Sequence, residues 1–258
     1  MLLEAIDVSK TFRSRRTSAP VHAVQNATLQ ARPGEFVAIV GESGSGKSTL
    51  ARLLLDLLDP TEGSIRLDGR EVGSMDRTER RAYRRSVQAV LQDPAGSLNP
   101  RKRVAQAIGE VIRLHGMARG SDETRQRVTE VLELVGMEPA AAFMDRFPHE
   151  LSGGQRQRVL IARAIALDPR IIVADEAVSA LDASVKAGVL AVMADLKDRL
   201  GVGYVFITHD LPVVQKVADH VYVMRHGRIL EHGPKDQIFA DPSHPYTREL
   251  LAASPALP

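Results

Sequence analysis

The sequence predicts an α/β fold with a mainly parallel sheet, an antiparallel β layer and a helical insertion. Short apolar runs alternate with stretches of helical spacing after residue 170, which is typical of parallel strands covered by helices. Alternating apolar and polar residues near the N-terminus indicate half-buried strands. Between residues 104 and 167 the spacing is helical throughout, so this part of the chain is predicted to interrupt the α/β pattern.

The spacing of apolar residues predicts three strands and a helix in the N-terminal part of the chain. Residues 2–8 and 21–29 alternate and are predicted to form strands of the β layer. Residues 36–40 form a wholly apolar run that stops at Gly41, which indicates a buried strand followed by a turn. Residues 47–58 then have the spacing of a helix.

The remaining elements define the expected domain organisation. Strands are predicted at residues 64–67, 87–91, 171–174, 204–208 and 221–224. Helices are predicted at residues 184–200 and 211–218. We therefore expect a single domain over residues 1–258, with an α/β core formed by 1–92 and 166–258 and a helical subdomain formed by 93–165.

Composition excludes several classes of protein. The 258 residues include no cysteine, which rules out disulfides, thiolate metal sites and cysteine nucleophiles. No window of about 18 apolar residues occurs, so we do not expect the chain to span a membrane. The formal net charge is only +2, and the basic runs at residues 13–16, 77–85 and 101–103 are interpreted as solvated faces.

The segment GESGSGKST, at residues 41–49, matches the phosphate-binding pattern G-x-x-x-x-G-K-[ST]. An apolar strand precedes it and a helix follows, so backbone N–H groups and the helix dipole would face an anion. Lys47 is expected to contact the β- and γ-phosphates of a nucleotide, and Ser48 to bind Mg²⁺. The nucleotide-binding residues predicted in this loop are Gly41, Ser43, Gly44, Ser45, Gly46, Lys47, Ser48 and Thr49.

Two carboxylates close the apolar run IIVADE at residues 171–176. They fall at the C-terminal edge of the predicted sheet, where ligands of α/β proteins bind. Asp175 is predicted to hold Mg²⁺ through its water shell. Glu176 is predicted to orient and polarise the water that attacks the γ-phosphate. The alternative interpretation is an acidic pair on a solvated loop.

A second glycine-rich turn, LSGGQ at residues 151–155, also precedes a helical pattern. It has no lysine, so it cannot form a complete nucleotide site of its own. Ser152, Gly153, Gly154 and Gln155 nevertheless offer a hydroxyl, free N–H groups and a helix dipole, all suited to a γ-phosphate. The alternative interpretation is a serine that only caps the helix.

The segments GESGSGKST, LSGGQRQRV and IIVADE, in this order, resemble the ATP-binding-cassette (ABC) ATPases over nearly the whole chain. The resemblance implies a P-loop NTPase core that binds ATP and Mg²⁺, and a facing subunit whose ATP the LSGGQ turn would cover. Gln92 would then reach Mg²⁺ and the attacking water, and His209, in FITHD, would contact the γ-phosphate. Asp182 would lie in the SALD segment at the partner subunit, and Phe12 would stack on adenine.

One departure from the family pattern lies beside Glu176. The chain has DEAVSALD where the family usually has DEPTSALD, so Ala177 and Val178 replace a proline and a threonine. Neither of the replaced residues carries the chemistry of the site.

Two longer stretches, LQDPAGSLNPRKRV (91–104) and HPYTRELLAASP (244–255), resemble the oligopeptide, dipeptide and nickel importer ATPases. This resemblance implies an ATP-hydrolysing subunit of a bacterial-type ABC importer for peptides, nickel or related small solutes, energised by ATP-driven dimerisation. The implied partners are a second, identical or homologous ATPase subunit, two membrane-spanning permease subunits and, indirectly, an extracytoplasmic solute-binding protein. The chain would lie peripherally on the cytoplasmic face of the inner (plasma) membrane.

The alternative function is that of a soluble ABC-type ATPase acting on nucleic acid or ribosomes. Only the arginine runs support it, and no nucleic acid is otherwise expected as a partner. Salt-dependent binding to DNA or RNA would favour this alternative.

Overall fold

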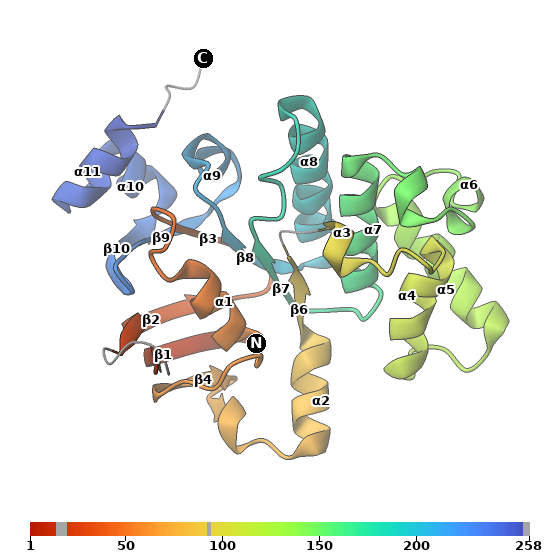
Figure 1. Cartoon of the computed structure of the whole chain (residues 1–258), viewed down its shortest axis with the longest axis horizontal. Helices are drawn as coiled ribbons and strands as arrows, with labels where there is room; N and C mark the ends of the chain where they lie inside the picture. Colours follow the sequence, from red (N-terminus) through yellow and green to blue (C-terminus); the bar gives the residue numbers. More distant parts are fainter. Residues whose placement is uncertain (14–19, 92–93, 255–258) are drawn as a thin grey trace.

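A computed structural model describes residues 1–13, 20–91 and 94–254, which form two sheets surrounded by helices (Figure 1). The smaller sheet is antiparallel and has the strand order β2-β1-β4-β5. Its strands are β1 (Leu3–Phe12), β2 (Val21–Ala31), β4 (Glu62–Leu67) and β5 (Arg70–Glu71). This sheet is the antiparallel layer that the alternating N-terminal pattern predicted.

The larger sheet has six strands in the order β10-β9-β3-β8-β7-β6. Five strands run parallel, and β10 pairs antiparallel with β9 at one edge. The strands are β3 (Phe36–Val40), β6 (Val87–Val90), β7 (Ile171–Asp175), β8 (Gly203–Ile207), β9 (His220–Arg225) and β10 (Arg228–Pro234). The predicted fold class, an α/β protein with a mainly parallel sheet, is therefore confirmed.

The described part of the segment between β6 and β7 consists of helices and the loops that connect them. Within the described residues 94–165 the chain is helical and has no strand. These helices are α3 (Pro94–Ser97), α4 (Val104–Leu114), α5 (Ser121–Leu134), α6 (Ala141–Met144) and α7 (Gly153–Ile165). They lie together on one side of the molecule (Figure 1). The division into a core and a helical subdomain over 93–165 stays a prediction.

The remaining helices lie around the α/β core. They are α1 (Lys47–Leu54), α2 (Arg77–Ser86), α8 (Ala183–Leu200), α9 (Leu211–Val217), α10 (Lys235–Ala240) and α11 (Pro245–Ala252), with short 3₁₀ turns at Val72–Ser74 and Pro148–Glu150. Among the described residues, none of the helices combines the length and apolarity that a membrane span requires.

The central strands are buried on both faces, and successive residues face different apolar clusters. In β7, Ile172 and Ala174 pack with the helices α4, α5 and α7, whereas Ile171 and Val173 pack with α1 and the antiparallel sheet. All five residues of β7 are buried. This explains why the sequence of such a strand is a continuous apolar run instead of an alternating one.

Helix α2 was not predicted, because its sequence RTERRAYRRS has almost no apolar period. The helix forms because Asp76 caps it and Glu79 completes a capping box. Tyr83 is its one buried residue and donates its hydroxyl to the carbonyl of Leu54. The basic run predicted as a solvated face is thus the outer surface of a helix anchored by one tyrosine.

Candidate nucleotide-binding site

The predicted phosphate-binding loop connects β3 to α1. Its glycines have conformations and surroundings that other residues cannot share. Gly46, at the N-cap of α1, has a φ of 106°, and a Cβ on Gly41 would lie 2.0 Å from the carbonyl oxygen of Met224. The loop therefore lies directly against the end of β9.

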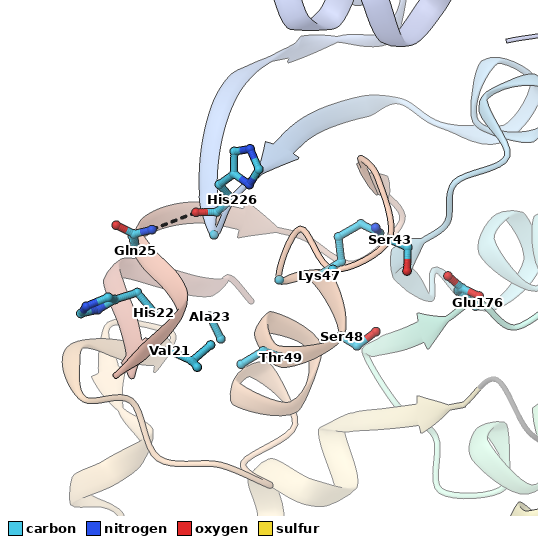
Figure 2. A pocket seen from close by; sticks show the side chains of 13 residues that line it. Val21, His22, Ala23, Gln25, Ser43, Lys47, Ser48, Thr49, Glu176 and His226 are labelled. Carbon is cyan, nitrogen blue, oxygen red and sulfur yellow. Dashed lines mark hydrogen bonds between the residues drawn. The ribbon is translucent and has the colours of Figure 1, made fainter. Parts of the chain in front are cut away.

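A cavity of about 570 Å³ opens beside this loop (Figure 2). Six of the eight predicted loop residues line it, whereas Gly41 and Ser45 do not. The lining residues are Val21, His22, Ala23, Gln25, Ser43, Gly44, Gly46, Lys47, Ser48, Thr49, Glu176, His226 and Gly227. The cavity is bounded by β2, the loop, the start of α1, the end of β7 and the turn between β9 and β10.

Lys47 is folded onto its own loop. Its ammonium donates to the carbonyls of Gly41 and Glu42 at 2.8 and 2.7 Å, and to the hydroxyl of Ser45 at 3.2 Å. Burial lowers the pKa of Lys47, and the nearby carboxylates of Glu176, Asp175 and Glu42 oppose that shift. A buried ammonium held only by carbonyls and a hydroxyl is well placed to exchange these partners for phosphate oxygens.

Ser48 lines the cavity, and its hydroxyl donates to Oδ1 of Asp175 at 3.1 Å. Burial raises the pKa of Asp175, while the Ser48 hydrogen bond lowers it and the charge of Glu176 raises it further. A hydroxyl and a buried carboxylate are hard oxygen donors of the kind that Mg²⁺ prefers. These two residues therefore fit the predicted metal role: they would hold Mg²⁺, which would supply positive charge against the phosphates.

Glu176 has an unusual backbone conformation. Its φ is 48°, in the left-handed region that residues with a Cβ rarely adopt. Its N–H donates to the carbonyl of Ile207 at 2.9 Å, which ties the strained turn to the neighbouring strand β8. The turn aims the side chain into the cavity beside the loop (Figure 2). Strain of this kind tends to be retained where a side chain must point in one functional direction.

His209 lies next to Glu176. Its Nδ1 is 3.4 Å from Oε1 of Glu176, and the two side chains are 62% and 22% exposed. The structure thus brings together the predicted water-activating carboxylate and the predicted γ-phosphate contact, from the ends of adjacent strands. The His209 side chain is thus mostly exposed to solvent, and that of Glu176 is partly exposed.

The LSGGQ turn begins α7 but does not line this cavity. Ser152 caps the helix, since its hydroxyl accepts the N–H of Gln155 at 3.2 Å and its own N–H donates to Oε1 of Gln155 at 3.0 Å. Helix α7 lies among α3–α6, apart from α1 and the loop (Figure 1). The exposed Ser152 and the start of α7 therefore lie away from this chain's own cavity.

The two glycines of this turn pack against the segment that contains Asp182. A Cβ on Gly154 would lie 2.4 Å from Cγ1 of Val185, and a Cβ on Gly153 would lie 3.3 Å from Cδ2 of Leu181. Asp182 itself is the N-cap residue of α8, with no side-chain capping bond. The start of α7 thus packs against the end of the SALD segment and the start of α8.

The other predicted residues have mixed outcomes. Gln92 lies outside the described residues. Phe12 is 39% exposed, with the Lys10 ammonium 5.5 Å from its ring centroid, and it is not among the described residues that line the cavity. It pairs with Val21, a lining residue that is 56% exposed. Its role toward adenine stays a prediction.

Ala177 and Val178, the departures from the family pattern, are 3% and 1% exposed and pack in the cluster that includes α7 and α8. The substituted positions are thus filled by apolar side chains that face the core and not the cavity.

Sequence reasoning missed the far wall of the cavity, formed by β2 and the β9–β10 turn. Gln25 donates from its N–H to the carbonyl of Gly227 at 2.8 Å and from Nε2 to the carbonyl of His226 at 2.9 Å. Gly227 in turn donates to the carbonyl of Ser45 at 2.8 Å. No motif marks these residues, because the wall is held by hydrogen bonds to backbone carbonyls of distant segments.

Comparison with known proteins agrees with this geometry. The sequence profile of the ABC transporter family matches residues 24–179. The glutathione import ATP-binding protein GsiA of Salmonella paratyphi A is 47% identical over 240 residues, and that of Escherichia coli K12 is 46% identical. Each match covers 93% of this chain but 38% of the relative, so the chain spans under two fifths of the length of these relatives.

Solved cassettes have the same fold. CbiO1 from Clostridium perfringens, part of the transporter complex cbiONQ, superposes with a TM-score of 0.79 at 28% identity, over 93% of this chain and 90% of its own. The ATP-binding cassette MJ0796, a dimer bound to ADP and Pi, gives 0.78 at 30% identity, over 90% and 98% of the two chains. The chain belongs to the ABC transporter family.

Proposed function

We propose that this chain is the ATP-hydrolysing subunit of an ABC importer for peptides or related small solutes, and that ATP-driven dimerisation of two cassettes energises transport. The observation that best supports this proposal is that the predicted nucleotide-binding residues lie in two separate places on the chain. Residues of the loop, Ser48 and Glu176 line one cavity, and Asp175 contacts Ser48, while the LSGGQ turn of the same chain lies apart from this cavity. A site divided in this way is completed by a facing subunit.

The residues have separate roles in this proposal. Lys47 and the loop amides bind the phosphates, and Ser48 and Asp175 hold Mg²⁺, with Gln92 as a further contact. Glu176 accepts hydrogen-bond donation from the attacking water and polarises it, while His209 contacts the γ-phosphate. The 3.4 Å approach of His209 Nδ1 to Glu176 supports their joint action. Phe12 stacks on the base beside the exposed Val21.

The proposed partner contributes its own Ser152, Gly153, Gly154 and Gln155 to the γ-phosphate of this chain, and receives the same residues in return. Asp182 lies at that interface, because its segment packs against the LSGGQ glycines. The partner is an identical or homologous cassette. MJ0796, which is similar to this chain, forms a dimer.

The importer assignment rests on the similarity to GsiA, which is a glutathione import ATP-binding protein. Because glutathione is a tripeptide, peptide-like solutes are the proposed cargo class, and nickel is retained only as a further solute of the importer group. Two membrane-spanning permease subunits and, indirectly, a solute-binding protein complete the proposed assembly. The chain would act peripherally at the cytoplasmic face of the membrane.

The alternative of an ATPase acting on nucleic acid loses support from the arginine run of α2. Arg80 and Arg84 pair with Asp56 at 3.5 and 2.9 Å. Arg81 and Arg85 donate to the carbonyls of Leu114 and Leu167. Four of the five arginines in this run therefore have partners within the chain, instead of forming an open surface for phosphates.

The test is reconstitution. The chain is purified together with the membrane proteins that bind it, and ATP-dependent uptake of labelled glutathione, a dipeptide and Ni²⁺ is measured in vesicles. We expect uptake of a peptide-like solute that stops with Glu176→Gln. ATP hydrolysis stimulated by RNA or DNA, without uptake of any of the three solutes, would contradict the proposal.

A further inference from the structure

The C-terminal motif HPYTRELL, at residues 244–251, reaches the phosphate-binding loop through one side chain. Tyr246 is 2% exposed, and its hydroxyl oxygen accepts the backbone N–H of Glu42 at 3.2 Å. Glu42 is the second residue of the loop, and Tyr246 follows it by 204 positions. The motif that distinguished the importer group in the sequence thus has a direct contact with the nucleotide-binding element.

Arg225 lies over the ring of Tyr246. The guanidinium lies 4.3 Å from the ring centroid, a cation–π geometry. Arg225 is the last residue of β9, and the preceding residue, Met224, is the one whose carbonyl lies against Gly41. Tyr246 is therefore placed between the end of β9 and the first residues of the loop.

Glu231 of β10 fixes the segment that carries Tyr246. The side chain of Glu231 accepts the N–H and hydroxyl of Ser243 at 2.7 and 2.6 Å and the N–H of His244 at 3.1 Å. Burial alone would raise the pKa of Glu231, but these hydrogen bonds hold it at about 2. Nδ1 of His244 then accepts the N–H of Tyr246 at 3.1 Å, which starts α11. The ionised Glu231, on the edge strand β10, thus fixes the position of the segment that carries Tyr246.

The peptide groups around Glu42 have two anchors. The N–H of Glu42 is held by Tyr246, and its carbonyl is held by the Lys47 ammonium at 2.7 Å. If Lys47 binds phosphate oxygens, as the proposed function requires, its bonds to Gly41 and Glu42 are lost or weakened. The Tyr246 contact uses neither Lys47 nor the cavity face of the loop, so it persists.

We propose that Tyr246 is a positioning residue for nucleotide binding: it holds Glu42 so that the loop keeps its shape when Lys47 turns from the loop carbonyls to a phosphate. The proposal rests on the proposed function, since it concerns the same site. It assigns to the C-terminal motif a direct effect on ATP affinity. Tyr246 does not touch the reacting atoms and acts only through Glu42.

The test compares Tyr246→Phe with Tyr222→Phe in the full chain. Tyr222 is a matched control, because it is 6% exposed and its hydroxyl also accepts a backbone N–H, that of Gln30 at 3.1 Å, away from the loop. Two quantities are measured: exchange of the Glu42 amide in nucleotide-free protein by NMR, and the Kd for Mg-ATP. In the assembled transporter, KM for ATP and kcat are measured separately.

We expect Tyr246→Phe to speed exchange of the Glu42 amide and to weaken Mg-ATP binding about three- to tenfold, the effect of losing one hydrogen bond. KM should rise while kcat changes little, and Tyr222→Phe should change neither quantity. Unchanged exchange and affinity in Tyr246→Phe, or equal changes in both variants, would overturn the inference. Absence of Mg-ATP binding by the unmodified chain would overturn the proposed function itself.

Discussion

The hydroxyl of Ser48 donates to Oδ1 of Asp175 at 3.1 Å, which joins the first turn of α1 to the last residue of β7. The two residues are 127 positions apart, and Ser48 lines the cavity beside the loop. Asp175 is only 8% exposed, so few water molecules can solvate its carboxylate. A buried carboxylate paired with one hydroxyl is incompletely satisfied and is suited to a cation.

Asp175→Asn removes this charge while keeping the size of the side chain. We expect Mg²⁺-dependent ATP binding to weaken at least about tenfold, since orienting groups around a metal have effects of this size. Titration of Mg²⁺ at fixed ATP measures the change. Asp198→Asn, on the exposed surface of α8, is the control and should behave as the unmodified chain does. Equal Mg²⁺ dependence in both variants would remove Asp175 from the metal site.

Glu176→Gln should separate nucleotide binding from hydrolysis. The variant keeps the hydrogen-bonding capacity toward water but loses the negative charge, so turnover should fall about 10²- to 10⁴-fold. ATP-bound dimers should then accumulate, which light scattering detects in the presence of the proper partner cassette. A variant that hydrolyses ATP at the normal rate would show that another group polarises the water.

Gly154→Ala should disturb the contact between α7 and α8, because the added methyl would lie 2.4 Å from Cγ1 of Val185. Overpacking of this kind costs about 1–3 kcal/mol, or about 2–10 °C in the melting temperature. The double change Gly154→Ala with Val185→Ala should recover most of the loss. Gly153→Ala meets only Leu181 at 3.3 Å and should have the smaller effect. If the two glycine variants melt alike, the close approach at Gly154 is not what limits packing.

Glu231→Gln should destabilise the protein in a pH-dependent way. The pKa of Glu231 is lowered from 4.5 to about 2, so the ionised form stabilises the folded state. This contribution is complete above the unfolded pKa and is lost as the pH falls toward the folded pKa. The free energy of unfolding of Glu231→Gln should thus be lower than that of the unmodified protein by the full amount at pH 6, and this difference should shrink below about pH 4.5. Denaturant titrations measure it, with the exposed Glu249→Gln as control. A gap that stays constant with pH would contradict the assignment.

The basic stretch at residues 99–104 is either a permease contact or a solvated loop, and its arginines are not equivalent. Arg103 pairs with Asp145 at 3.2 Å, and its guanidinium lies 5.3 Å from the Phe147 ring centroid, so changing it would perturb the fold locally. Arg101 is exposed. Arg101→Glu should leave basal ATPase activity within about twofold and weaken permease association if it lies at that contact. Arg125→Glu on α5 is the control, and equal assembly of the two variants would exclude the contact.

Sequence patterns predicted the strands best where burial makes them wholly apolar, as in β3, β7 and β8. They identified the loop and the Asp175–Glu176 pair as candidate site residues because these chemistries require particular residues at fixed spacing. Helix α2 escaped prediction because caps and one buried tyrosine stabilise it, without an apolar face. The contact of Tyr246 with Glu42 escaped because it depends on how the chain returns to the loop, which no local period encodes.

The side chain of His209, which lies beside Glu176, is 62% exposed. Water therefore reaches the place where the γ-phosphate would lie, and a hydrated anion gains little from fixed charges. A dry, low-dielectric environment would come only from the surface that covers it. In a solution of this cassette alone, ATP turnover should thus depend on the encounter of two molecules. The specific activity should rise with protein concentration and saturate when most molecules have their site covered by another molecule. The dependence of the hydrolysis rate on protein concentration would then show that a second molecule, and not a residue of the cavity, excludes water from the site.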